Sequence, residues 1–163
     1  MGLFGESAQS NFRRAQKLIE DVLTSMGLNA DKSRLETKDG STAWDLMRGN
    51  AEVLVFLNAA RKEGDDNFLR IVSPIVRLPT ENLLPLYRRL LELNARDLPG
   101  IAFGVVDQDI VLVAQRGTRD LDRSEVDEML RNLGAAADHY DDKLAQEFGG
   151  RKISDLPREE RST

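Results

Sequence analysis

The sequence predicts an α+β domain in which helices pack on one face of an antiparallel sheet of about five strands. Three observations lead to this fold class. Apolar residues recur at helical spacing near the start, in the middle and near the end of the chain, and short β-branched runs with turn signals lie between them. The resulting order is α-β-β-β-α-β-β-α. A chain of 163 residues fits one domain, which we expect over residues 1–150.

The first helix is expected over residues 10–26 and should end at Gly27, since glycine accepts the left-handed conformation. Its apolar residues recur every three or four positions: Phe12, Ala15, Ile19, Val22 and Met26. Residues 32–38 have the composition of a weak edge strand before the turn signal Asp39–Gly40.

Three strands should follow the first helix. They are expected over residues 42–47, 51–60 and 67–76. The connections 48–50 and 62–66 are short and rich in turn residues, which favours an antiparallel meander. Pro74 cannot donate to a strand ladder, so we expect it at a strand end, an edge or a bulge.

The second helix should occupy residues 83–95, with Asn82 as its N-cap. Pro85 then lies in the first turn, where a missing N–H breaks no helical hydrogen bond. One face is expected to hold Leu83, Leu86, Tyr87, Leu90, Leu91 and Asn94. Two strands follow, over residues 101–106 and 109–115, joined by a tight turn at Asp107–Gln108.

The third helix has the clearest start in the chain. Asp122 and Glu125 have the spacing of a capping box, and Leu121 with Val126 that of a hydrophobic staple. Apolar residues then keep helical spacing up to Gly149–Gly150. Residues 151–163 are polar and lack this periodicity, which predicts a flexible tail.

Residues 68–115 carry the most informative pattern. A β-branched run, ValSerProIleVal with LeuPro after it, precedes a Leu-rich helix that closes on LeuGluLeuAsn, and a hairpin follows. With Trp44 in an earlier strand and AspLeuAsp before the last helix, the chain resembles the YbjN-like family over residues 10–148. The fold of that family is similar to that of the type III secretion chaperones. The resemblance implies a scaffold for association and brings no functional residues with it.

Catalytic and metal chemistry finds little support in the sequence. Cysteine is absent, and His139 is the single histidine. Asp138, Asp141 and Asp142 lie beside it, but a transition-metal site usually needs a second His or Cys. No nucleophile motif or phosphate-binding loop appears. We therefore expect no catalytic, metal-binding or cofactor-binding residues.

Charge and hydropathy restrict the partners. The net charge is −5, and no Lys/Arg block of the kind that neutralises phosphates is present, so we expect no nucleic-acid partner. No apolar run is long enough to span a bilayer, so we expect no membrane partner. The absence of cysteine is typical of a reducing compartment, and the predicted location is the cytoplasm.

The strands divide into two faces when alternate residues are separated. One face is almost entirely apolar and should meet the helices: Val53, Val55, Leu57, Leu69, Ile71, Ile75, Ile101, Phe103, Val105, Ile110, Leu112 and Ala114. The other face mixes polar residues with five apolar ones. These five are the candidates for a partner or dimer interface: Leu54, Phe56, Val72, Val111 and Val113. A covering segment of the same chain is an equally good explanation for them.

The predicted function is a non-enzymatic protein-binding module, chaperone-like or regulatory, that acts as a homodimer and binds an unidentified protein. Two alternatives remain open at this point. One is a sensor domain that holds a small molecule between the second helix and the sheet. The other is a small metal-dependent enzyme centred on His139.

Overall fold

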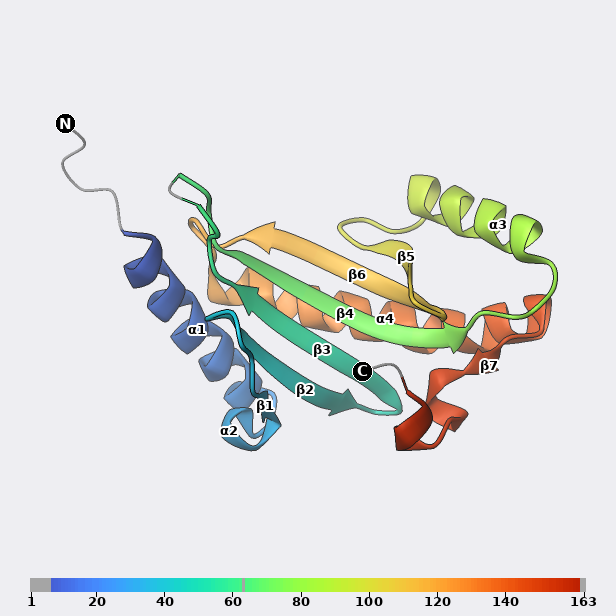
Figure 1. Ribbon diagram of the computed structural model, residues 1–163, viewed down its shortest axis with the longest axis horizontal. Coiled ribbons are helices and arrows are strands. Elements are labelled where there is room, and N and C mark those ends of the chain that lie inside the picture. Colours follow the sequence, from blue (N-terminus) through green and yellow to red (C-terminus); the bar gives the residue numbers. More distant parts are fainter. Residues whose placement is uncertain (1–6, 63, 162–163) are drawn as a thin grey trace. The chain divides into compact units, whose positions relative to one another are not determined.

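The computed structural model describes residues 7–62 and 64–161. Its element order confirms the predicted fold class, and two additional short strands enlarge the sheet (Figure 1). The strand order is β1-β2-β3-β4-β6-β5, with β7 pairing to β4 outside this path. The helices of the described residues are α1 (Ala8–Ser25), α2 (Ala30–Ser33), α3 (Leu83–Arg96) and α4 (Arg123–Phe148). The strands are β1 (Arg34–Leu35), β2 (Thr42–Arg48), β3 (Ala51–Asn58), β4 (Phe68–Arg77), β5 (Ala102–Val106), β6 (Asp109–Gly117) and β7 (Arg151–Lys152).

The backbone divides into two compact units. The described part of the first comprises residues 7–46, 54–70 except 63, and 115–128. That of the second comprises residues 47–53, 71–114 and 129–161. Strands β2, β3, β4 and β6 and helix α4 each contribute one part to either unit.

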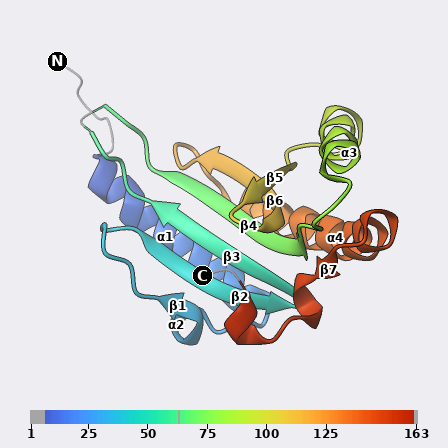
Figure 2. The same cartoon turned by 45° about the vertical axis from the view of Figure 1, so that its right-hand side comes forward.

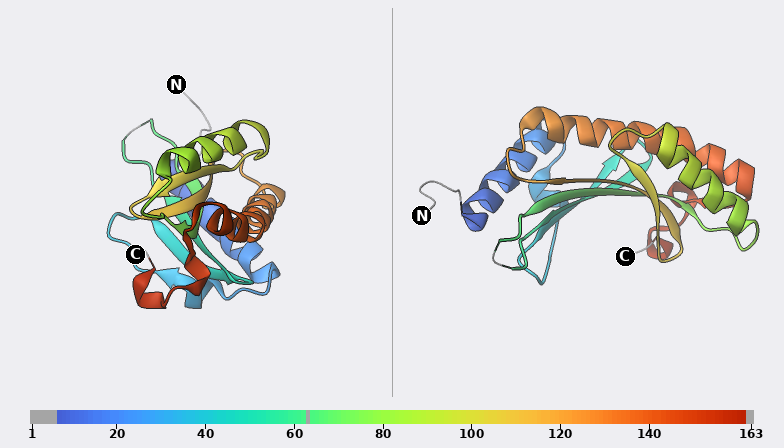
Figure 3. Two further views of the ribbon diagram at one scale, coloured as in Figure 1. Left: turned by 90° about the vertical axis from the view of Figure 1, so that its right-hand side faces the viewer. Right: turned by 90° about the horizontal axis from the view of Figure 1, so that it is seen from above.

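In the first unit, α1 lies along one face of the strands (Figures 1 and 3). The helix begins after Ser7, whose hydroxyl accepts a hydrogen bond from the Ser10 backbone N–H at 3.1 Å, and this cap extends it beyond the predicted start. Gly27 follows with φ 79°, the left-handed conformation expected of it. The buried residues of this unit include Ile19, Val22, Leu23, Trp44, Val55, Leu57 and Leu69.

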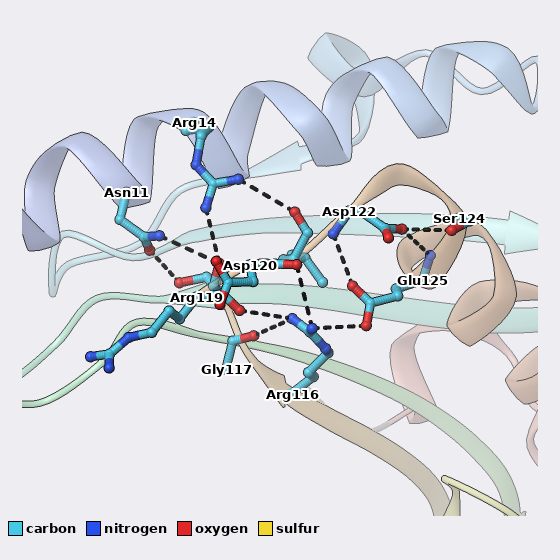
Figure 4. Close-up of polar contacts among 11 residues, drawn as sticks. Asn11, Arg14, Arg116, Gly117, Arg119, Asp120, Asp122, Ser124 and Glu125 are labelled. Carbon is cyan, nitrogen blue, oxygen red and sulfur yellow. Dashed lines mark hydrogen bonds and ion pairs between the residues drawn. The ribbon is translucent and has the colours of Figure 1, made fainter. Parts of the chain in front are cut away.

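The turn between β6 and α4 confirms the predicted capping box and staple (Figure 4). The Glu125 carboxylate accepts from the Asp122 N–H, and the Asp122 carboxylate accepts from the Glu125 N–H, both at 2.9 Å. Hydrogen bonds from the Ser124 hydroxyl and the Glu125 N–H lower the pKa of Asp122. Leu121 and Val126 are both buried. The end of α4 that belongs to the first unit is therefore fixed by its own sequence.

Helix α1 is tied to this turn by polar side chains of the first unit (Figure 4). Arg14 donates to the carbonyl oxygens of Thr118 and Leu121 at 3.2 and 3.3 Å. Asn67, which is buried, donates to the Ala8 carbonyl at 2.7 Å and accepts from the Ala60 N–H at 2.9 Å. These bonds satisfy backbone groups where loops meet the start of α1, so the polar residues stabilise the loops.

In the second unit, α4 runs along one face of the strands (Figure 3). Strands β5 and β6 form the predicted hairpin, with Phe103 opposite Leu112 and the turn at residues 107–108. The predicted inner face is confirmed at its buried positions in this unit: Val53, Ile71, Ile75, Phe103, Ile110, Leu112 and Ala114. Val105, also assigned to that face, is 44% exposed because it lies near the turn on the outermost strand.

The described part of the predicted flexible tail is folded onto the second unit (Figure 2). Strand β7 pairs antiparallel with the end of β4, with Val76 opposite Lys152 and Arg77 opposite Arg151. Two short 3-10 turns follow, and Ile153 and Leu156 are buried at 1% and 3% exposure. Two apolar side chains three positions apart are enough to dock a segment that has no longer periodicity. Residues 162–163 lie outside the described part of the chain.

Candidate functional site

The five candidate interface residues differ in exposure. In the first unit, Leu54 and Phe56 of β3 are half-buried. In the second unit, Val72 and Val113 are half-buried, whereas Val111 is only 2% exposed. The expectation that Val111 offers surface to a partner is therefore wrong.

The surroundings of Val111 include the other strand of the hairpin. Val111 lies opposite Gly104 in the β5–β6 hairpin. Its Cγ2 atom is 3.7 Å from the place where a Cβ on Gly104 would lie. A side chain on Gly104 would therefore only touch Val111 at ordinary contact distance. Alternation along one strand does not reveal these surroundings, since they depend on the residue across the hairpin.

Helix α3 exposes two large apolar residues on one face. Leu84 is 80% exposed and Leu91 68% exposed, whereas Leu86, Leu90 and Leu93 of the same helix are buried. The spacing of seven between Leu84 and Leu91 places them on the same side of the helix. The expectation that Leu91 shares a face with Leu86 and Leu90 is therefore wrong, and Leu93 is buried with them instead.

The edge strand β5 lies beside α3 (Figure 2). Asn94 of α3 donates to the Phe103 carbonyl at 3.1 Å and accepts from the Phe103 N–H at 2.7 Å. The amide thereby takes the place of a neighbouring strand at this residue, which closes the edge to backbone pairing there. Val105 and Val106, further along β5, are 44% and 45% exposed.

His139 lies on the exposed side of α4. Its ring packs edge-on against Tyr140 with ring centroids 4.7 Å apart, and its Nε2 atom is 2.7 Å from Lys143 Nζ. Within the described residues, no group of three or more His, Cys, Asp or Glu side chains is arranged to hold a metal ion. The local geometry therefore gives no support to the metal-dependent alternative.

The carboxylates near His139 interact with β7. Lys152 Nζ lies 2.8 Å from Asp142 and 3.9 Å from Asp141. The hydrogen bond to Asp142 raises the pKa of Lys152, and burial raises the pKa of Asp141. These acidic residues act as partners of the C-terminal segment.

The described residues also contain two open hollows. One, of about 540 Å³, lies in the first unit at the start of α1, and Phe12, Arg13 and Asn67 contribute to its wall. The other, of about 320 Å³, lies in the second unit between the end of α4 and β7. Neither has the place that the sensor alternative requires, between the second helix and the sheet.

No helix in residues 7–62 or 64–161 combines the length and the apolar character needed to cross a membrane.

Comparisons with known proteins extend these observations. No curated protein sequence matches the chain significantly. The crystal structure of the ExsC–ExsE complex contains a chain with a TM-score of 0.59 and 17% identity, and the match covers 82% of this chain and 95% of that one. The HopA1–SchA chaperone–effector complex contains another, with a TM-score of 0.56 and 11% identity, covering 82% of this chain and 97% of that one. At these identities the likeness is one of fold.

The sequence itself gives the family. A family model described as T3SS (YopN, CesT) and YbjN peptide-binding chaperone 1 matches residues 13–156. This range includes the strand, helix and hairpin pattern of residues 68–115 on which the YbjN-like resemblance was based, and confirms it. The chain belongs to the family of T3SS and YbjN peptide-binding chaperones.

Proposed function

We propose that the protein is a non-enzymatic, chaperone-like module that binds an extended segment of a partner protein and acts as a homodimer. The family description supports peptide binding. The observation that carries association for this chain, and the homodimer in particular, is its exposed apolar surface on α3 and β5: Leu84, Leu91, Val105 and Val106. Large apolar side chains in water mark association surfaces when they gather on one element.

Peptide selection tests this function. A display library of random peptides of about 12 residues would be selected against the wild-type protein. We expect a shared pattern of apolar residues, since a sheet binds extended peptides through alternate side chains. A selection that returns no reproducible pattern, or none that binds the isolated protein, would contradict peptide binding.

The homodimer is assigned to the outer face of α3. Leu84 and Leu91 have the spacing by which two helices pack along a common seam. Their exposure also means that they contribute little to the stability of the monomer. Dimerisation would bury them, and each fully buried leucine contributes about 1.5–3 kcal/mol before the costs of association.

Leu91→Glu is expected to convert the dimer to a folded monomer of 18.3 kDa. A charge at this position opposes burial in the dimer and changes the stability of the monomer by no more than about 0.5 kcal/mol. Light scattering at micromolar concentration measures the mass. The matched control is Leu35→Glu, the same change at a 41% exposed position on β1, which should remain dimeric. A wild-type protein that is monomeric at high concentration would contradict the dimer.

The partner surface is assigned to the accessible candidate residues of the first unit, Leu54 and Phe56 of β3. Both are half-buried, as are Val72 and Val113 in the second unit. A half-buried side chain packs partly against the core, and its exposed part is free to contact a ligand. Leu54 and Phe56 are therefore suited to binding apolar side chains of an extended segment.

Phe56→Glu should weaken binding of the selected peptides at least tenfold, because a desolvated carboxylate opposes an apolar contact. Asn58→Glu, at another half-buried position of β3, is the control for added charge. Fluorescence anisotropy measures the affinity, and circular dichroism reports folding. An unfolded variant would place Phe56 in the core, and unchanged binding would remove β3 from the partner surface.

A further inference from the structure

The C-terminal segment lies on the second unit in the manner of a bound peptide. Strand β3 begins at Ala51, and the Ser73 hydroxyl donates to the Glu52 carbonyl at 2.7 Å. The end of β4 therefore extends beyond the start of β3. Strand β7 occupies this free length, pairing with β4 at Val76 and Arg77. Addition of a short strand to an open sheet edge is a common mode of peptide recognition.

Two side chains of the segment are buried on the second unit, and Ile153 fills a groove beside this edge. Ile153 and Leu156 are 1% and 3% exposed, although their neighbours Asp155, Pro157 and Arg158 are exposed. Pro74 and Ile75 of β4 and Ala137 of α4 line the space beside Ile153. The volume left beside Ile153 is about 10 Å³, which is room for about one water molecule. The groove thus fits a branched aliphatic side chain closely.

Charged residues at the margin of the groove bind the polar parts of the segment. Arg77 donates to the Glu160 carbonyl at 2.6 Å, and Asp142 pairs with Lys152 at 2.8 Å. Glu52 lies 4.0 Å from Arg161. The site that holds the segment therefore combines a backbone edge, the apolar groove beside Ile153 and a margin of both charges.

The segment is joined to α4 by Gly149 and Gly150. Gly149 ends the helix with φ 80°, a conformation that glycine adopts without strain. A Cβ on Gly150 would lie 2.5 Å from Val76 Cγ1 and 2.7 Å from the Arg77 carbonyl oxygen. The close approach of the segment to β4 therefore depends on glycine at position 150.

We propose that this groove is a peptide-binding site of the protein and that residues 151–161 occupy it in cis until a partner segment displaces them. The inference rests on the proposed function and identifies the partner by its chemistry. The partner supplies an extended segment with two branched aliphatic residues three positions apart, a basic residue before the first to face Asp142 and a second basic residue after the second to face Glu52. A partner peptide can bind only to molecules in which the groove is open. Its apparent affinity therefore equals its intrinsic affinity multiplied by the fraction of such molecules.

Gly150→Ala tests the proposal in the full-length chain, because it loosens β7 without changing a groove side chain. Gly117→Ala is the matched control, since a Cβ there meets nothing within 4 Å. The probe is a fluorescently labelled synthetic peptide with the sequence of residues 149–163. We expect Gly150→Ala to bind it at least tenfold more tightly than the wild type or Gly117→Ala. Equal affinity for all three proteins would overturn the proposal.

Hydrogen exchange on the wild-type protein provides a second test that needs no variant to fold. With the unlabelled peptide present in excess, amides of residues 151–156 of the protein should lose protection while those of β4 keep it. Residues 151–156 that stay protected at saturating peptide would overturn displacement.

Competition separates this inference from the proposed function. Peptides selected against the wild type whose binding does not depend on Phe56 should displace the labelled probe from Gly150→Ala. If none of these peptides displaced the probe, the inference alone would be overturned and peptide binding would remain intact. A selection that returns no binding peptide would contradict the proposed function. Binding of the labelled probe to Gly150→Ala would still support a groove that binds the C-terminal segment.

Discussion

Removal of residues 151–163 is expected to lower the free energy of unfolding by about 3–4 kcal/mol. The truncation removes the buried side chains of Ile153 and Leu156, and deletion of one buried aliphatic side chain costs about 2–5 kcal/mol. The freedom gained by the released chain offsets part of this loss. For a protein of this size the melting temperature should fall by roughly 10 °C.

Denaturant unfolding measures the effect of the truncation. The control is Arg158→Ala with Glu159→Ala, two exposed positions of the same segment, which should change the free energy by no more than about 0.5 kcal/mol. A truncated protein as stable as the wild type would mean that the segment is a dispensable tail and does not contribute to the core of the second unit.

Arg77→Ala should destabilise the protein by about 3–5 kcal/mol, the range for removing one partner of a buried ion pair. Arg77 forms an ion pair with Asp109, whose side chain is 1% exposed. Arg77 also donates to the Glu160 carbonyl at 2.6 Å, so the same change loosens the C-terminal segment. Thermal and denaturant unfolding both measure the loss.

Arg151→Ala is the matched control for Arg77→Ala. Its guanidinium pairs with Glu160 at 3.1 Å, but both side chains are more than half exposed, at 65% and 56%. Exposed pairs contribute no more than about 1 kcal/mol. If the two variants lost the same stability, the burial of Asp109 would not be the cause.

The elements of the fold could be predicted because their signals are local. The capping box at Asp122 and Glu125 set the start of α4, and the helix then ran to Phe148 as expected. Asn82 is the N-cap of α3, although with φ 60° and without a side-chain hydrogen bond. The place of the N-cap could be predicted because Pro85 fits the first turn of a helix. The left-handed backbone of Asn82 could not, because it depends on the preceding loop.

The pairing of β7 could not be predicted from local signals because its partner is distant in sequence. Strand β1 was expected as a weak edge strand, and only Arg34 and Leu35 pair with β2. Strand β7 has two residues, too few for alternation to be visible, and its partner β4 lies some 75 positions earlier. Its pairing follows from the free edge of β4, which is visible only in the folded chain.

The candidate surfaces show the same limit. Alternation assigned Leu54 and Phe56 to the face opposite the core, and both are half-buried. It failed for Val111, which is buried opposite Gly104, and helical spacing misplaced Leu91. Which side of a helix or strand faces the core depends on how the element is rotated against its neighbours. A helix with leucines at several adjacent positions fits more than one rotation, so spacing alone does not decide between them.

Titration of a selected peptide tests peptide binding most directly. The labelled peptide would be titrated with the wild-type protein by fluorescence anisotropy, beside a scrambled peptide of equal composition. We predict saturation with a dissociation constant on the order of 10 µM, about 7 kcal/mol, and at least tenfold weaker binding of the scrambled peptide. Equal binding of the two peptides, or no saturable binding of either, would contradict a peptide-binding function.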